Sequence, residues 1–130
     1  MEELINLGID NNELNKIISG INNINLISND DVKNKINILV RLNASIEEIK
    51  NIIICNPSYL NRLDKDILDL INCLSNYGFI NLNNLFDSNP LILNLDVYEI
   101  DNYINERLKN ETLEIIVNDL MDNPLIFNEI

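Results

Sequence analysis

At 130 residues, of which 46 % are hydrophobic, the chain is long enough to bury a core and too apolar for a disordered polypeptide. It carries 9 basic and 21 acidic residues, so its formal net charge of −12 repels polyanions such as nucleic acids. It contains no histidine, which removes the commonest general base and metal ligand of enzymes.

No segment of the sequence is predicted to cross a membrane. The longest purely apolar run, residues 52–55, is far shorter than the ~20 residues that a span requires. The chain begins Met-Glu-Glu and lacks the basic start and apolar stretch of a secretion signal. Cys55 and Cys73 fit no metal-binding spacing, and we interpret them as reduced core thiols. These features predict a cytoplasmic protein without a cofactor.

Apolar residues recur at steps of three and four, which places them on one face of a helix. The stripes, in chain order, are Val32, Ile36, Leu39 and Leu42; Ile46, Ile49, Ile52 and Ile53; Ile67, Leu70, Ile71, Leu74 and Tyr77; Leu82, Leu85 and Phe86; Ile100, Ile104 and Leu108; and Leu113, Ile116, Val117, Leu120 and Met121. Each stripe predicts one helix.

Residues with capping chemistry mark where the helices begin and end. Capping boxes, in which a side chain and a backbone N–H bond reciprocally, are predicted for Asp10 with Glu13, Ser45 with Glu48 and Asp96 with Glu99. Gly20 and Gly78 suit the left-handed conformation that closes a helix.

All three prolines follow an asparagine and are spaced by 33 and 34 residues. A large apolar residue follows three positions after each proline. The repeat signature is therefore Asn56, Pro57 and Leu60; Asn89, Pro90 and Leu93; and Asn123, Pro124 and Phe127. A degenerate first copy has Asn23-Ile24 in place of the pair and Leu26 or Ile27 in the apolar position.

Each Asn-Pro pair is expected to separate two helices. The residue before proline is pushed out of the helical region, so the preceding helix must stop. The asparagine can then cap a short new helix, of one turn and with 3₁₀ character, whose first residue is proline.

The predicted fold is all-α: a right-stacked helical-repeat solenoid of about four 33–34-residue units, each with two helices and a short 3₁₀ turn. Residues 1–130 form a single helical-repeat domain with units of about 1–30, 31–63, 64–96 and 97–130. One unit cannot bury its own apolar face, but stacked neighbours can.

The unit resembles the repeat of the mitochondrial transcription termination factor (mTERF) family. That repeat joins an apolar helix ending in Leu-Gly, a second helix and a proline followed by apolar residues. The corresponding segments are LINLGID (4–10), LVRLNAS (39–45) and LSNYGF (74–79), followed by NPSYL (56–60), NPLIL (89–93) and NPLIF (123–127). The resemblance covers most of the chain. It implies two helices and a 3₁₀ turn per unit, and binding of double-stranded nucleic acid along a basic concave groove.

The chain lacks the basic residues that such binding requires. A duplex-binding protein commonly neutralises about 6–10 phosphates with lysine and arginine, whereas only 9 basic residues are present here among 21 acidic ones. We therefore expect a non-enzymatic interaction module that binds a protein, either a different protein or a second copy of itself. The alternative function is an mTERF-like nucleic-acid-binding regulator.

Two groups of residues are candidate sites. Only the second unit is basic, and its cations could form a phosphate-binding patch: Lys33, Lys35, Arg41, Lys50 and Arg62. The same cations could instead form a solvated helix face or pair with acidic neighbours. The second site is an association end. The chain stops after its last Asn-Pro segment, so Phe127 and Ile130 could be left exposed. Alternatively, Phe127 folds back onto Leu120 and Met121 as core.

Overall fold

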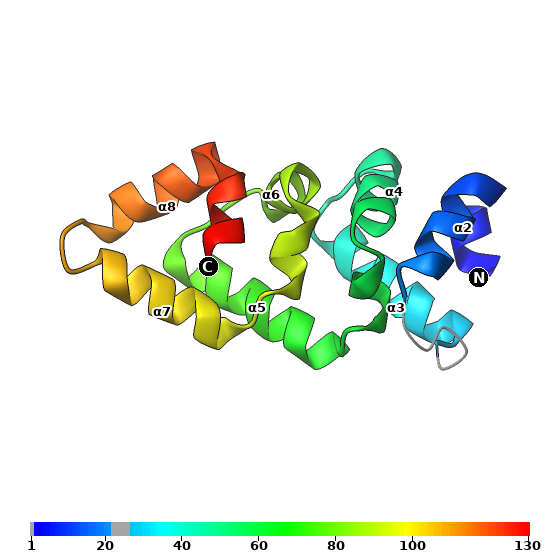
Figure 1. Cartoon of the computed structure of the whole chain (residues 1–130), viewed down its shortest axis with the longest axis horizontal. Helices are drawn as coiled ribbons and strands as arrows, with labels where there is room; N and C mark the ends of the chain where they lie inside the picture. Colours follow the sequence, from blue (N-terminus) through cyan, green and yellow to red (C-terminus); the bar gives the residue numbers. More distant parts are fainter. Residues whose placement is uncertain (1, 22–26) are drawn as a thin grey trace.

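The computed structural model describes residues 2–21 and 27–130, and it is all-helical (Figure 1). Within these ranges no strand is formed. The degenerate first copy predicted at Asn23, Ile24 and Leu26 lies outside the described residues.

Pairs of α-helices alternate with short 3₁₀ helices along most of the chain. In order the elements are α1 (Glu2–Asn6), α2 (Asn11–Ser19), α3 (Asn29–Arg41), α4 (Ile46–Cys55), the 3₁₀ helix η2 (Pro57–Asn61), α5 (Asp64–Tyr77), α6 (Leu82–Ser88), η3 (Pro90–Asn94), α7 (Val97–Arg107), α8 (Leu113–Asp122) and η4 (Pro124–Glu129). The predicted 3₁₀ helix after each Asn-Pro pair is confirmed in all three places.

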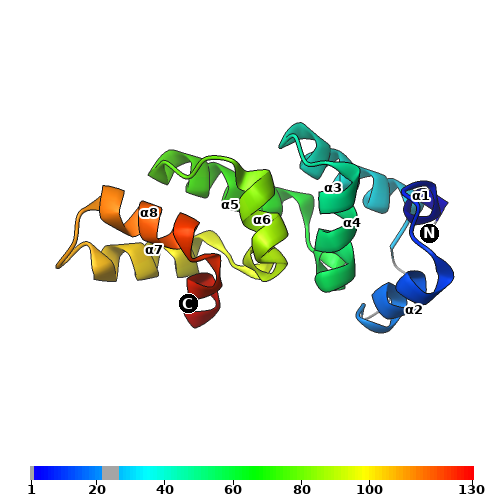
Figure 2. The ribbon, with the colours of Figure 1, turned by 90° about the horizontal axis from the view of Figure 1, so that it is seen from above.

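The helices follow one another along an elongated molecule. Helices α1 and α2 lie at one end and the α7–α8 hairpin at the other, in both views (Figures 1 and 2). Helix α4 packs between α2 and α6, while α1 contacts α3 and α5 contacts α7. The 3₁₀ helices form a row in which η3 contacts both η2 and η4. Elements about one Asn-Pro period apart therefore lie side by side.

The predicted capping boxes at Asp10, Ser45 and Asp96 are all present. A fourth box at the start of α3 was not predicted, because its third residue is aspartate rather than glutamate. There the Asp31 backbone N–H donates to Ser28 Oγ at 3.1 Å, and the Ser28 N–H donates to the Asp31 carboxylate at 3.1 Å. These hydrogen bonds to Ser28 lower the pKa of Asp31.

The two glycines predicted to close helices differ in conformation. Gly78 has φ 103° and ends α5 in the left-handed region, as predicted. The prediction for Gly20 is wrong, because its φ of −85° is right-handed. Its lack of a side chain has another cause: a Cβ atom there would lie 2.8 Å from Cγ of Pro57. Gly20 therefore permits the close approach of the α2 end to η2.

One hydrophobic cluster extends from Leu4 to Phe127 and contains most of the predicted stripe residues. Two members of the stripes are exceptions, since Ile46 is 60 % exposed and Leu108 is 40 % exposed. Ile46 is the first residue of α4 and Leu108 follows the last residue of α7. Both lie at a helix end, beyond the stretch that a neighbouring helix covers.

Candidate interaction surface

The three Asn-Pro pairs have the same backbone conformation. The asparagine φ and ψ angles are −137° and 72° at Asn56, −146° and 85° at Asn89, and −130° and 71° at Asn123. Each asparagine N–H donates to the carbonyl four residues earlier, at 2.9, 3.0 and 2.9 Å respectively, and so completes the preceding helix. The asparagine side chain of each pair therefore projects from a backbone of nearly the same conformation.

These asparagine side chains do not cap the 3₁₀ helices, so the predicted capping role is wrong. The Asn56 side chain instead reaches the next Asn-Pro segment along the chain. Its Nδ2 donates to the carbonyl oxygen of Pro90 at 2.9 Å and to Oδ1 of Asn94 at 3.0 Å. Its Oδ1 accepts from Asn94 Nδ2 at 3.2 Å and from Ser58 Oγ at 2.6 Å. Both ends of the amide are thus hydrogen-bonded.

Asn89 repeats this arrangement one segment later. Its Nδ2 donates at 3.0 Å to the carbonyl oxygen of Pro124 and at 3.0 Å to Oδ1 of Asn128. Asn56 and Asn89 are 2 % and 3 % exposed, and they are the only buried asparagines in the described part of the chain. We call these two links the asparagine ladder: Asn56 to Pro90 and Asn94, and Asn89 to Pro124 and Asn128. A buried amide needs such partners, because burial without them is costly.

The apolar and Asn-Pro patterns do not single out the acceptor asparagines, although the sequence contains a signal for them. Asn94 and Asn128 each lie five residues after the asparagine of an Asn-Pro pair, and Asn61 occupies the same position after Asn56. The abundance of asparagine throughout the chain hides this second periodicity.

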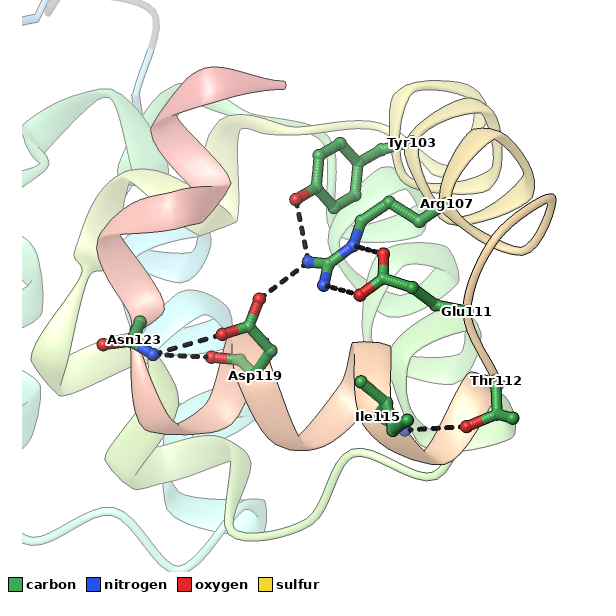
Figure 3. A network of polar contacts seen from close by, with 7 residues as sticks. All are labelled: Tyr103, Arg107, Glu111, Thr112, Ile115, Asp119 and Asn123. Atoms are coloured by element: carbon green, nitrogen blue, oxygen red, sulfur yellow. Dashed lines mark hydrogen bonds and ion pairs between the residues drawn. The ribbon is translucent and has the colours of Figure 1, made fainter.

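The third donor asparagine, Asn123, is exposed. Its Nδ2 is 3.3 Å from both the carbonyl oxygen and Oδ1 of Asp119, one helical turn earlier (Figure 3). These contacts are longer than those of the ladder. Asn123 therefore has the conformation of a ladder residue, while its side chain lies at the surface.

The apolar residues of the signature, Leu60, Leu93 and Phe127, are all buried at 0–1 % exposure. The prediction of an exposed association end is therefore wrong for Phe127. Its ring packs against that of Phe79, with centroids 5.8 Å apart and planes tilted by 50°. Helix η4 folds back against α8 and α6, which encloses the ring. Ile130 is partly buried against the same cluster.

The predicted phosphate patch loses two of its five cations to protein groups. Lys35 is 3 % exposed and forms an ion pair with Asp64. Arg62 donates from Nη1 to the carbonyl oxygen of Leu93 and, at 2.6 Å, to that of Leu95, at the end of η3. These cations join neighbouring segments because they neutralise a carboxylate and satisfy terminal carbonyls.

The other three residues of the predicted patch are more accessible. Lys33 and Arg41 are exposed on α3, and Lys50 on α4 lies 4.0 Å from the exposed carboxylate of Glu47. The hollow lined by Lys35, Arg62 and Lys65 is also lined by Asp31 and Asp64. An anion in that hollow would meet two carboxylates.

A charged network joins α7 to α8 (Figure 3). The Arg107 guanidinium makes a bidentate pair with Glu111 at 2.7 and 2.8 Å, an ion pair with Asp119 at 2.9 Å and a hydrogen bond to Tyr103 Oη at 3.1 Å. The pairing with Arg107 lowers the pKa of Glu111. This network orients Asp119, which in turn contacts Asn123.

Arg107 and Asp119 occupy positions that are apolar in the preceding helix pairs. Arg107 lies eleven residues after the N-cap of its helix, as do Leu39 and Leu74, which are both fully buried. Asp119 lies four residues before the asparagine of its Asn-Pro pair, as do the buried Ile52 and Leu85. The α7–α8 hairpin thus carries charges where the earlier pairs are packed with apolar side chains.

The two cysteines are free thiols in different environments. Cys55 is exposed, so its interpretation as a core thiol is wrong, because α4 turns its last residue toward solvent. Cys73 is half-buried and its Sγ lies 3.7 Å from Oδ1 of Asp101. Burial, together with the nearby Asp101 charge, raises the pKa of Cys73 to about 11. Cys73 is therefore mostly a neutral thiol at physiological pH.

Across residues 2–21 and 27–130, no three His, Cys, Asp or Glu side chains are grouped so that they could hold a metal ion. None of the helices described there has the length and apolar character needed to span a membrane. No protein-family model, curated protein or solved structure matches this chain.

Proposed function

We propose that this protein is a non-enzymatic helical-repeat solenoid of about four units that binds another protein. The observation that carries this proposal is the asparagine ladder. Asn56 and Asn89 make the same two hydrogen bonds to partners one period further along the chain. Units joined in this way would stack in one direction, and stacked units present an extended surface suited to binding a partner.

The charge distribution favours a protein partner over a nucleic acid. The formal net charge is −12, and two of the five cations in the basic second unit already bond to protein groups. A duplex would therefore find few free cations on a strongly negative surface. The mTERF-like resemblance supports the repeat architecture, and the nucleic-acid-binding regulator is the competing function.

A binding titration separates these two functions. The full chain is mixed with labelled duplex DNA and duplex RNA at physiological salt, and fluorescence anisotropy is followed. We expect no binding tighter than the ~10⁻⁴–10⁻⁶ M of non-specific complexes. Sub-micromolar binding that weakens steeply with salt would overturn the proposal. In that case, replacing Lys33 and Arg41 by alanine should abolish binding, whereas Lys65→Ala, which removes a lysine already paired with Asp69, should not.

The protein-binding function is tested with the same full chain as bait in a lysate of its native host. Captured proteins are identified by mass spectrometry, purified and titrated against the chain. We expect a saturable complex that does not require nucleic acid, and therefore survives nuclease treatment. If every captured protein dissociates after that treatment, the protein-binding function is wrong.

A further inference from the structure

The last Asn-Pro pair leaves Asp119, Asn123 and Ile126 more exposed than their counterparts in both earlier segments, which are buried. We define the C-terminal face as Ile115, Asn118, Asp119, Asn123 and Ile126. Ile115 is 55 % exposed and Asn123 is exposed. Ile126 is partly buried, whereas Tyr59 and Ile92, at the same position in the earlier segments, are fully buried.

The earlier segments show what chemistry covers such a face. Helix α4, which corresponds to α8, is covered by α6 and η3. Asn51, the counterpart of Asn118, donates to the carbonyl and carboxylate oxygens of Asp87 at 3.0 and 2.8 Å. Asn56, the counterpart of Asn123, donates to a proline carbonyl and to an asparagine four residues after that proline. The occupant in both links of the ladder is a 3₁₀ helix that begins with proline.

Asn123 has the backbone conformation needed to bind a 3₁₀ helix of the same kind. Its backbone angles match those of Asn56 and Asn89, and its two contacts to Asp119, at 3.3 Å each, are long for hydrogen bonds. Rotation of its side chain toward a partner would exchange them for hydrogen bonds of the kind that Asn56 and Asn89 make. The backbone thus places the side-chain NH2 of Asn123 so that its two hydrogens can be donated to a proline carbonyl and to a side-chain oxygen.

The charge of this end selects the partner. Residues 97–130 contain eight acidic and two basic side chains, and Asp119 stands where Ile52 and Leu85 are packed in the earlier segments. A second copy of the chain, also at −12, would be repelled. A basic partner would be attracted. A lysine or arginine beside its 3₁₀ helix could pair with Oδ1 of Asp119, because Arg107 is paired with the other carboxylate oxygen, Oδ2.

Given the proposed protein-binding function, we propose that the C-terminal face binds a proline-initiated 3₁₀ helix of a basic partner protein. Asn123 donates to the carbonyl of that proline and to a side-chain oxygen four residues later. Ile115 and Ile126 cover the apolar side of the partner helix, and Asp119 meets a cation.

The probe is a peptide with the sequence of residues 88–96 in which both terminal residues are replaced by lysine. The isotope-labelled full chain is titrated with it and followed by nuclear magnetic resonance. We expect saturable shifts confined to residues 113–129, which comprise α8, Asn123 and η4, and including the Asn123 side-chain amide. The control peptide, in which the proline and the asparagine four residues later are replaced by alanine, should bind about tenfold more weakly, because the side-chain acceptor for Asn123 is lost and proline no longer fixes the first residue of the 3₁₀ helix.

Asn123→Ala in the full chain should weaken binding of the lysine-flanked peptide to the same extent, about tenfold. The matched control is Asn105→Ala, an exposed asparagine on α7 outside the face. Unchanged melting of both variants shows that the fold is intact. Absence of saturable shifts, shifts outside residues 113–129, equal binding of the two peptides, or no effect of Asn123→Ala would each overturn the proposal.

The outcomes for this face and for the proposed function are separable. If a partner protein binds the chain and Asn123→Ala leaves its affinity unchanged, the protein-binding function holds and the assignment of this face is wrong. If the peptide binds as expected while the chain also binds duplexes at sub-micromolar concentration, the assignment of the C-terminal face is correct and the proposed function is wrong.

Discussion

Asn89→Ala removes one complete link of the asparagine ladder and should destabilise the fold substantially. The substitution deletes the hydrogen bonds from Nδ2 to the Pro124 carbonyl and to Asn128, each 3.0 Å long, at a side chain that is 3 % exposed. A net hydrogen bond contributes about 0.5–1.5 kcal/mol, and a buried acceptor left unpaired costs about 1–3 kcal/mol. We expect a loss of about 2–4 kcal/mol, a large part of the ~5–15 kcal/mol that stabilises a typical domain.

Asn123→Ala is the matched control, since it changes the same residue type in the same Asn-Pro context. Its side chain is exposed and makes only the two 3.3 Å contacts to Asp119, so we expect a loss below about 0.5 kcal/mol. Urea denaturation followed by circular dichroism gives both values. If the asparagines were N-caps, each Asn→Ala substitution would instead lower the free energy of unfolding by about 1 kcal/mol at every pair. Equal losses at Asn56, Asn89 and Asn123 would therefore refute the ladder as the main role of these side chains.

Three further changes test the packing and the thiols. Phe127→Asp should cost at least the ~3–5 kcal/mol of a deleted buried aromatic, seen in urea denaturation, and sedimentation should show no change in association, contrary to a sticky end. Gly20→Ala should cost about 1–3 kcal/mol, because its Cβ would lie 2.8 Å from Pro57 Cγ; a raised melting temperature would contradict this close approach. Cys55 should react with a thiol reagent at mildly alkaline pH faster than Cys73, whose reactivity should rise as the pH approaches its pKa of about 11; equal rates in the folded chain would contradict this difference.

Features set by nearby residues were predictable from the sequence. The capping boxes at Asp10, Ser45 and Asp96 depend on pairs three residues apart, and the breaks before Pro57 and Pro90 follow from the steric effect of proline on its predecessor. The apolar stripes predicted the buried cluster because a packed helix must bury one face.

Side-chain partners distant in sequence were not predictable in the same way. The sequence leaves open whether Lys35 and Arg62 bind a phosphate or pair with acidic neighbours. Their partners in the structure are Asp64 and the end of η3, which only packing brings near. The pattern identified Asn56 as important but assigned it a local capping role, because the competing acceptors lie 34 and 38 residues away. Local chemistry can propose a hydrogen bond, but the tertiary arrangement decides which one forms.

The asparagine ladder has a direction, since both donors reach toward the C-terminus. Translation delivers the donor first: the Asn56 amide leaves the ribosome before the Pro90 carbonyl, 34 residues later, and the Asn94 side chain, 38 residues later. At about 5–20 residues per second, that interval lasts about 2–8 s. During it, water must solvate an amide that is later buried, so the segment around η2 cannot reach its final packing. A nascent chain of this protein should therefore mature stepwise from its N-terminus, always about one period behind synthesis.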